Sequence, residues 1–198
     1  MFLVDLQAGQ KTGAFLDQRE NRIAAAGYLR GRVLDAFCYD GGFALHAARR
    51  VESVEGVDSS ESSLARAARN AERNGLSNIH LVRGNVFDFL AQADRSGARY
   101  GGIVLDPPAF AKSRKDLAPA VRAYKEINLR AMRCLEPGGV LVTCSCSYNL
   151  HEDEFVGVLA AAASRGAAGA GPRPGRHPSR AFQSYPPPRP LDRGDLPC

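Results

Sequence analysis

The sequence predicts a single α/β domain with a mostly parallel β-sheet and helices on both of its faces. Two observations carry this prediction: short apolar segments without strict alternation, and helical patterns in the stretches between them. Apolar segments of this kind are typical of strands that are buried on both faces of a parallel sheet. A chain of 198 residues is long enough to bury a substantial core within one domain.

The rest of the chain is organised around residues 32–58. Apolar residues at 33–37 predict a buried strand. Gly41 and Gly42 follow, where the backbone must turn tightly and let a ligand come close. Residues 43–50 then show a helical pattern, so that a helix N-terminus would face the same ligand. This order of elements predicts a ligand site at the turn.

A carboxylate ends the next apolar segment. Asp58 lies 23 residues after Asp35, where a βαβ unit places the acidic residue that accepts hydrogen bonds from ribose hydroxyls. The turn lacks the GxGxxG spacing, which argues against NAD as the ligand. An ordinary βαβ unit, whose glycines serve only the turn, is the alternative interpretation.

The same patterns predict the remaining elements. Further helices are expected at 18–28, from Ser59 or Ser60 to about Asn74, at 86–93, at 119–135 and from 151 to about 163. Further strands are expected at 1–6, 79–82, 102–105 and 140–144. Side chains suited to N-capping precede three of these helices, namely Asp17, Ser59 or Ser60, and Asn85.

Residues 106–110, with the sequence DPPAF, follow the predicted strand 102–105. The two prolines make a stiff, extended exit from the sheet. Asp106 therefore stands at the carboxyl end of a strand, where open α/β sheets bind ligands. This is the second strongest indication of a site in the chain.

Charge and cysteine content narrow the class of protein. Residues 164–198 carry six arginines and two aspartates, which is +4 of the net charge of +5, so the global charge is weak support for a nucleic-acid partner. Five cysteines without paired CxxC spacing argue against a zinc site and against a closed disulfide framework. With no signal peptide and no apolar stretch long enough to span a membrane, we expect a cytoplasmic protein.

Residues 164–198 do not read as a fold. They hold eight of the twelve prolines, and their few hydrophobic residues lack a period. We expect this tail to be disordered or to be translated from a shifted reading frame. Sequencing the gene tests the second hypothesis, which an intact native frame through codon 198 would exclude.

Four segments together resemble one family: residues 11–19 (KTGAFLDQR), 37–43 (FCYDGGF), 106–110 (DPPAF) and 145–147 (SCS). It is the bacterial 23S rRNA (cytosine-5)-methyltransferase family, whose members are class I S-adenosylmethionine (SAM)-dependent enzymes with an N-terminal PUA domain and a Rossmann-like fold. The resemblance covers about residues 1–160. Within the sequence we find neither the PUA domain nor the usual C-terminal strands.

The resemblance implies SAM as cofactor and a cytosine of 23S rRNA as methyl acceptor, with no metal and no membrane partner. The resemblance does not fix the oligomeric state, and a homodimer is one option. Residues 1–17 would form an N-terminal strand and a cofactor lid, and residues 18–163 the methyltransferase domain. Contacts with the cofactor would come from the lid, the first turn and the strand ends: Phe15, Gln18, Arg19, Asp35, Phe37, Tyr39, Gly41, Asp58, Ser59, Asn85, Val86 and Asp106.

The chemistry of cytosine-5 methylation asks for a cysteine and a carboxyl group side by side. Carbon 5 is a poor nucleophile, and a thiolate that adds to carbon 6 makes it enamine-like. An acid near N3 stabilises the charge that develops there. Cys146 follows the predicted strand 140–144, and Asp106 follows its expected neighbour, so we predict these two as the catalytic pair.

The other cysteines are weaker candidates. Cys144 is expected within the strand or buried, which makes it the alternative nucleophile, and Cys38 and Cys134 are expected to be structural. Three other functions compete with cytosine-5 methylation. They are guanine-N7 methylation, which needs no cysteine, methylation of a small molecule or protein on the same fold, and a non-catalytic fragment.

Overall fold

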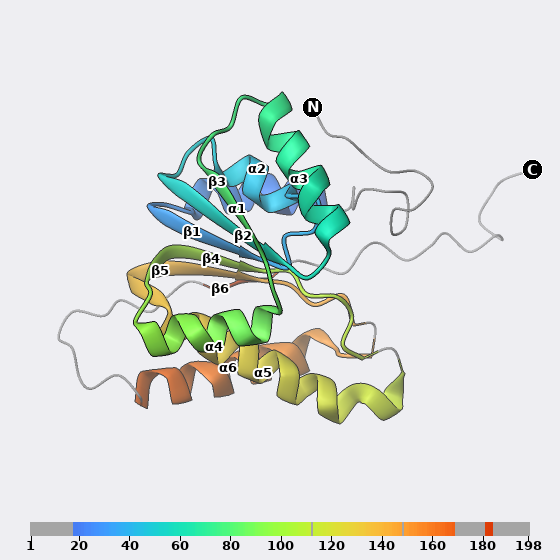
Figure 1. Ribbon diagram of the computed structural model, residues 1–198. Coiled ribbons are helices and arrows are strands. Elements are labelled where there is room, and N and C mark those ends of the chain that lie inside the picture. The colour runs from blue at the N-terminus through green and yellow to red at the C-terminus, as the bar shows by residue number, and fades with distance from the viewer. Residues whose placement is uncertain (1–17, 112, 148, 169–180, 184–198) are drawn as a thin grey trace, which may run out of the picture.

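The computed structural model of the chain describes residues 18–111, 113–147, 149–168 and 181–183. The sheet order is β3-β2-β1-β4-β5-β6, and all neighbouring strands are parallel, which confirms the predicted class (Figure 1). The elements are α1 (Arg19–Tyr28), β1 (Arg32–Ala36), α2 (Gly42–Ala47), β2 (Ser53–Asp58), α3 (Glu61–Arg73), β3 (Ile79–Arg83), α4 (Val86–Ser96), β4 (Tyr100–Leu105), the short 3₁₀-helix Arg114–Asp116, α5 (Leu117–Arg133), β5 (Leu135–Thr143), α6 (Glu152–Ala168) and β6 (Ala181–Gln183).

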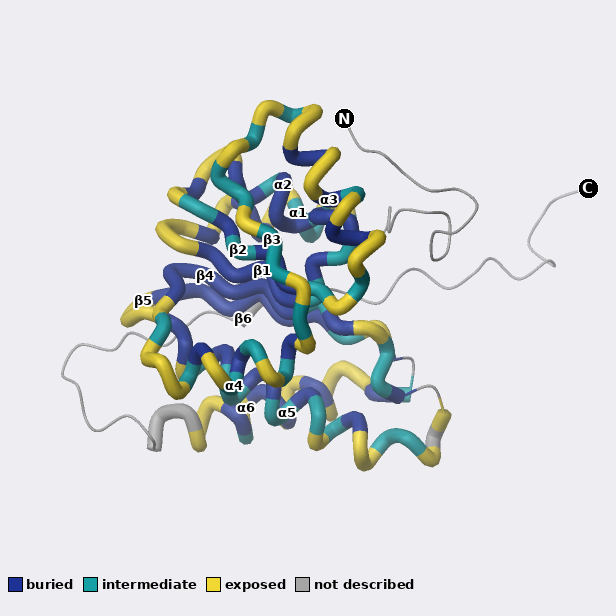
Figure 2. Tube along the Cα trace, viewed as in Figure 1, coloured by how far each residue is buried: buried dark blue, intermediate teal, exposed yellow. Residues whose placement is uncertain are grey.

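Helices cover both faces of the sheet. Helices α1, α2 and α3 lie on one face, and α4, α5 and α6 lie on the other (Figure 1). Successive residues of β4 alternate between the two cores: Ile103 packs toward α4–α6, while Val104 packs with residues of α1 and α2. The central strands β1 and β4 are buried almost throughout, whereas no residue of the edge strand β3 is buried, and the outer faces of the helices are exposed (Figure 2). Burial on both sides explains why the central strands lack polar–apolar alternation.

The topology fixes where a ligand can bind. Strands β1 and β4 are neighbours, so the chain passes to β2 and β3 on one side of β1 and to β5 on the other. In open parallel sheets such a reversal leaves a crevice at the carboxyl ends of the two central strands. The turn after β1 and the DPPAF segment after β4 are the two segments that lie there.

Two of the expected helix caps are confirmed. The Ser60 hydroxyl accepts a hydrogen bond from the Ser63 N–H, and the Asn85 side chain accepts from the N–H groups of Phe87 and Asp88. Gln18 stands at the N-cap of α1, where its side chain makes no capping hydrogen bond to the backbone. Asp17, the predicted cap, lies outside the described residues, as does the predicted strand 1–6.

Strand β5 and the tail differ from the prediction. β5 begins at Leu135, because Leu135 pairs with Tyr100 before residues 136–139 bulge out and Val140 resumes pairing opposite Gly102. Helix α6 continues to Ala168, beyond the expected end, and α2 ends at Ala47 rather than at residue 50. Where no strand was expected, β6 pairs with β5 over three residues. Ladder bonds to an open edge need no alternating side chains, which is why the pattern gave no sign of it.

Candidate active site

The turn after β1 is held in an unusual backbone conformation. Phe37 and Tyr39 have φ values of 64° and 47°, and Gly41 has a φ of 82°. The left-handed region is unfavourable for residues with a Cβ, and it persists only where the surroundings impose it. Strained positions of this kind gather at ligand sites, and contacts from β2 and α3 impose the conformation of this turn.

Asp58, at the end of β2, is the first of these contacts. Its Oδ2 accepts a hydrogen bond from the Tyr39 N–H at 3.0 Å, and its Oδ1 accepts from the Ser60 N–H at 2.8 Å. One carboxylate therefore fixes both the turn after β1 and the start of α3. Ser59, which lies between Asp58 and Ser60 in the chain, is exposed.

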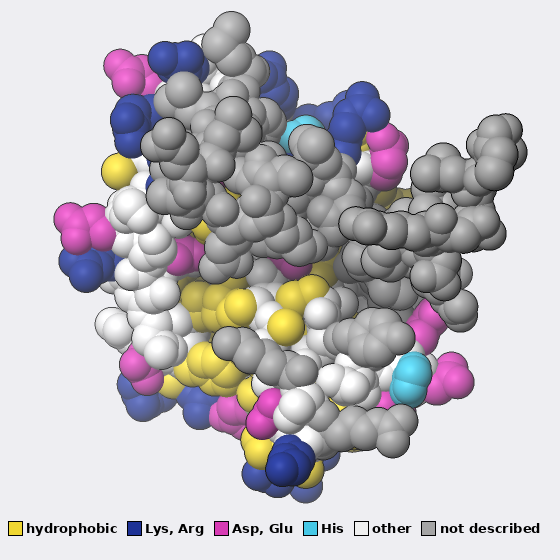
Figure 3. Space-filling model, turned by 90° about the vertical axis from the view of Figure 1, so that its right-hand side faces the viewer, with side chains coloured by type: hydrophobic (Ala, Val, Ile, Leu, Met, Phe, Trp, Pro, Cys, Tyr) yellow, Lys and Arg dark blue, Asp and Glu magenta, His cyan; other side chains and the backbone are white. Residues whose placement is uncertain are grey.

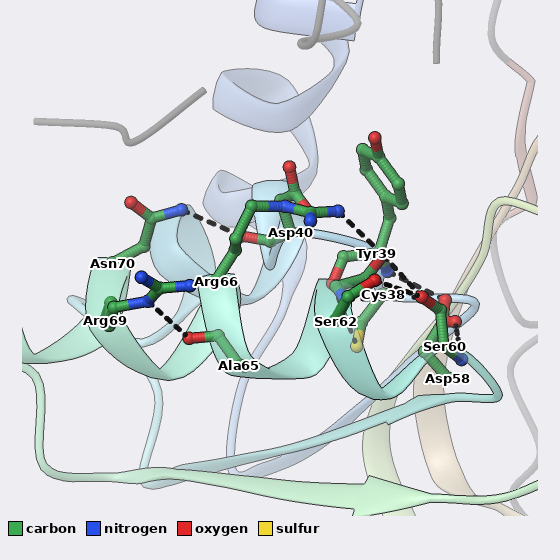
Figure 4. A network of polar contacts seen from close by, with 11 residues as sticks. Cys38, Tyr39, Asp40, Asp58, Ser60, Ser62, Ala65, Arg66, Arg69 and Asn70 are labelled. Carbon is green, nitrogen blue, oxygen red and sulfur yellow. Dashed lines mark hydrogen bonds and ion pairs between the residues drawn. The ribbon is translucent and has the colours of Figure 1, made fainter. Parts of the chain in front are cut away.

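Helix α3 supplies a second set of contacts (Figure 4). The Nε of Arg66 lies 2.9 Å from the Oδ1 of Asp40, and the Asn70 side chain donates to the Asp40 carbonyl oxygen at 3.3 Å. The Arg66 guanidinium also stacks 5.6 Å from the centre of the Tyr39 ring. We did not predict these roles. The sequence indicates these contacts only through the spacing of Arg66 and Asn70, which lie one helical turn apart beside the apolar face of α3.

Asp35 is a buried carboxylate beneath the turn. Its Oδ2 accepts from the Ala44 N–H in the first turn of α2 at 2.8 Å, while its Oδ1 has no hydrogen-bond partner among the described residues. Burial raises the pKa of Asp35 to about 7, against the lowering effect of the Ala44 bond, and the charges of Asp106 and Asp58 raise it further. Three carboxylates thus converge on the carboxyl ends of β1, β2 and β4.

Helix α1 reaches the turn through a residue that we had not predicted. The Arg22 guanidinium lies against Gly42, where a Cβ would stand 2.6 Å from it, and its charge lowers the pKa of Asp35. The predicted Gln18 instead accepts from Asn21, and Arg19 pairs with Glu20 at the surface. The sequence indicates this contact only by spacing: Arg22 follows the predicted Arg19 by three residues, so both lie on the same side of α1.

Aromatic side chains join the turn after β1 to the DPPAF segment. The Phe37 ring lies 6.5 Å from Phe87 and 6.4 Å from Phe110, and the last two are 5.9 Å apart. Asn85, just before α4, is exposed, whereas the Val86 side chain is buried, so that only the backbone of Val86 can face a ligand. Viewed from the right-hand side of Figure 1, hydrophobic side chains gather near the middle of this face, with carboxylates beside them (Figure 3).

The structure brings the predicted catalytic segments together. Cys146 is exposed just beyond β5, and its Sγ–H donates to the Pro107 carbonyl oxygen at 3.4 Å. Pro107 directly follows Asp106 at the end of β4, and β4 pairs with β5 as expected. A thiol and a carboxylate from neighbouring strand ends therefore share one edge of the sheet.

The other described cysteines are buried. Cys144 has 1% of its surface exposed and packs with residues of α1 and α2, on the face of the sheet that these two helices cover. Burial raises the pKa of the Cys38 thiol well above its ordinary range and that of Cys134 to about 11. Thiols that stay protonated are poor nucleophiles, so Cys38 and Cys134 are unsuited to covalent catalysis.

Phe15, the remaining predicted cofactor residue, lies outside the described part of the chain. Within the described residues no group of three or more His, Cys, Asp or Glu side chains is arranged to hold a metal ion. None of the helices described is both long and apolar enough to cross a bilayer.

Comparison with known proteins agrees with this geometry. The family model of the methyltransferase domain matches residues 30–168. The Ribosomal RNA large subunit methyltransferase I proteins of Aeromonas hydrophila and Aeromonas salmonicida are 48% and 45% identical over 165 residues, which is 81% of this chain and 42% of theirs. The chain thus spans about two fifths of the length of these relatives. SMU.776, assigned as a methyltransferase and solved with SAH, superposes with a TM-score of 0.72 at 26% identity, over 82% of this chain and 44% of that one. The chain belongs to the methyltransferase-domain family.

Proposed function

We propose that the chain is the SAM-dependent catalytic domain of an rRNA methyltransferase that methylates carbon 5 of a cytosine through a covalent Cys146 adduct. The observation that carries the proposal is the hydrogen bond from the Cys146 thiol to Pro107, the residue after Asp106. The relatives named as large subunit rRNA methyltransferases support 23S rRNA as the substrate.

The residues around the turn fit SAM. Asp58 uses one lone pair of each oxygen for a backbone N–H and keeps others to accept from ribose hydroxyls. By the family resemblance, the exposed Asn85 would contact the adenine, and Phe37, Tyr39 and Gly41 form the turn that would face the cofactor. SAM supplies an electrophilic methyl group on a positively charged sulfur.

The charges around Asp35 are compatible with a cationic ligand. Burial is the main cause of the raised pKa of Asp35, the Arg22 guanidinium lowers that pKa, and Asp106 and Asp58 raise it, which means that the three carboxylates repel one another in their charged forms. A positive charge placed among them would relieve this repulsion and favour ionised Asp35. The orphan Oδ1 of Asp35 is a buried acceptor that a ligand would satisfy, directly or through water.

The chain's own residues would then carry the proton and electron movements. The Cys146 thiol gives its proton to a base and the thiolate adds to carbon 6, so that the electron pair of the carbon 5–carbon 6 double bond moves toward carbon 5 and N3. Asp106, as the acid near N3, stabilises that charge. After methyl transfer a base removes the carbon 5 proton, the carbon 6–sulfur bond breaks, and Cys146 leaves as thiolate.

Guanine-N7 methylation is the main alternative. It uses a nitrogen that is already nucleophilic, and nothing in that reaction asks for an exposed thiol beside the DPPAF segment. A small-molecule or protein substrate needs no such thiol either. A fragment that binds cofactor without catalysing transfer would keep the site around the turn but show no turnover.

Transfer assays separate these functions. Wild type, Cys146→Ala and Cys144→Ala are incubated with SAM and 23S rRNA transcript, and the digested nucleosides are identified by mass spectrometry. We expect 5-methylcytosine from wild type and Cys144→Ala and none from Cys146→Ala, with unchanged SAH affinity by calorimetry. 7-Methylguanine, or 5-methylcytosine from Cys146→Ala, would refute the proposal, and SAH binding without any transfer would favour the fragment.

A further inference from the structure

The hydroxyl of Tyr124, on α5, belongs to a ring of hydrogen bonds with Ser145 and Ser147, the two neighbours of Cys146. Ser145 Oγ–H donates to the Tyr124 hydroxyl oxygen at 3.2 Å, and that oxygen lies 3.0 Å from Ser147 Oγ. Because Tyr124 accepts from Ser145, its own hydrogen is available to donate to Ser147. The Ser147 N–H donates to Ser145 Oγ at 3.4 Å, which closes the ring.

The ring is anchored in the core and to the second catalytic segment. Tyr124 is fully buried, and its ring lies 4.7 Å from Phe110 and 5.3 Å from Phe155. The Ala111 N–H donates to Ser147 Oγ at 3.1 Å. The exit of β5 is thereby tied to the DPPAF segment and its successor, residues 106–111.

Cys146 lies in the chain between the two serines of the ring. Both neighbours of Cys146 turn their hydroxyls inward to Tyr124, and Cys146 itself is exposed with its thiol directed at Pro107. A backbone fixed on both sides of a residue fixes where its Cβ and sulfur can lie. Burial raises the pKa of Tyr124, so its hydroxyl keeps the proton that the ring needs over the physiological range.

We propose that Tyr124 is a positioning residue for the covalent step: its hydroxyl, through Ser145 and Ser147, holds Cys146 beside Asp106 at the distance that attack on carbon 6 requires. The inference rests on the proposed function, because it presupposes Cys146 as nucleophile. Tyr124 lies beneath the segment, and its action on the reaction passes through the two serines.

Tyr124→Phe tests the hydroxyl alone, because it keeps the ring that packs on Phe110 and Phe155. Tyr100→Phe is the matched control: Tyr100 is equally buried and its hydroxyl donates to Glu55 at 2.7 Å, but it stands at the start of β4. Ser147→Ala and the double variant complete a cycle. The probe is RNA containing 5-fluorocytosine, whose fluorine blocks the final elimination and traps the cysteine adduct in the presence of SAM.

We expect Tyr124→Phe to slow adduct formation at saturating RNA by about 10- to 100-fold, as for a reactive group displaced by about 1 Å. RNA affinity and SAH affinity should stay within about twofold of wild type, and Tyr100→Phe should react at the wild-type rate. The rate of adduct formation in the double variant should be little lower than in either single variant, because each of these three variants breaks the same ring. Additive losses would instead show that Tyr124 and Ser147 act independently of each other, and would overturn the ring.

Equal rates for wild type and Tyr124→Phe would overturn the inference, as would equal losses in the two tyrosine variants. Failure of the proposed function looks different. In that case wild type forms no adduct, or Cys146→Ala still forms one, and the role of Tyr124 in this step falls with it.

Discussion

The Nε of Arg66 lies 2.9 Å from the Oδ1 of Asp40, and both side chains are largely withdrawn from solvent, with 14% and 11% of their surfaces exposed. The pair joins α3 to the turn after β1, where Phe37 and Tyr39 hold left-handed backbone conformations. Because the turn is strained, its conformation depends on such contacts. The Arg66–Asp40 pair therefore supports the cofactor site that we propose.

Arg66→Met should weaken both folding and SAH binding. The substitution removes the Arg66 charge that lies beside the Asp40 carboxylate, and breaking a buried ion pair typically costs about 3 kcal/mol. Urea denaturation and SAH calorimetry measure the two effects. Arg83→Met is the control, because its pair with Glu61 is 65% and 77% exposed and such pairs contribute less than about 1 kcal/mol. Similar results for the two variants would show that the Arg66 pair has no special role.

Asp35 should make the stability of the chain fall as pH rises. Its pKa is raised from 3.8 to about 7, so between these values the folded state binds more protons than the unfolded state, and the free energy of unfolding decreases with pH. A shift of this size corresponds to about 4 kcal/mol. Asp35→Asn keeps an acceptor for the Ala44 N–H and removes the titration. Its stability relative to wild type should therefore rise from pH 4 to pH 7, and parallel urea-denaturation profiles across that range would contradict the account.

Two glycines should respond oppositely to alanine. A Cβ at Gly101 would stand 2.3 Å from the Arg30 carbonyl oxygen, which is backbone and cannot move aside, so Gly101→Ala should destabilise the fold by about 3 kcal/mol. Gly157, in α6, has open space around it, and Gly157→Ala should stabilise by about 0.5–1 kcal/mol through helix propensity. Thermal unfolding of both variants checks the packing of β4, and a neutral Gly101→Ala would mean that β1 and β4 are not packed as described.

The sequence predicted what depends on local pattern. Apolar segments located the five central strands, and short polar side chains located the caps at Ser60 and Asn85. The contacts that shape the site escaped because they join distant residues. Tyr124 fitted the apolar face of its helix, and its bonds to Ser145 and Ser147 span 21 and 23 residues of sequence. Arg66 likewise reads as a surface residue until the turn is placed beside it.

The central claim is that Cys146 is the nucleophile, and the most direct measurement is the site of covalent attachment. Wild type is incubated with SAM and 23S rRNA transcribed with 5-fluorocytidine, then digested, and the nucleotide-bearing peptide is fragmented in the mass spectrometer. The account predicts a nucleotide bound to the sulfur of Cys146. Attachment at Cys144, Cys134 or any other residue would contradict it, as would the absence of an adduct from an enzyme preparation that forms 5-methylcytosine on unmodified 23S rRNA.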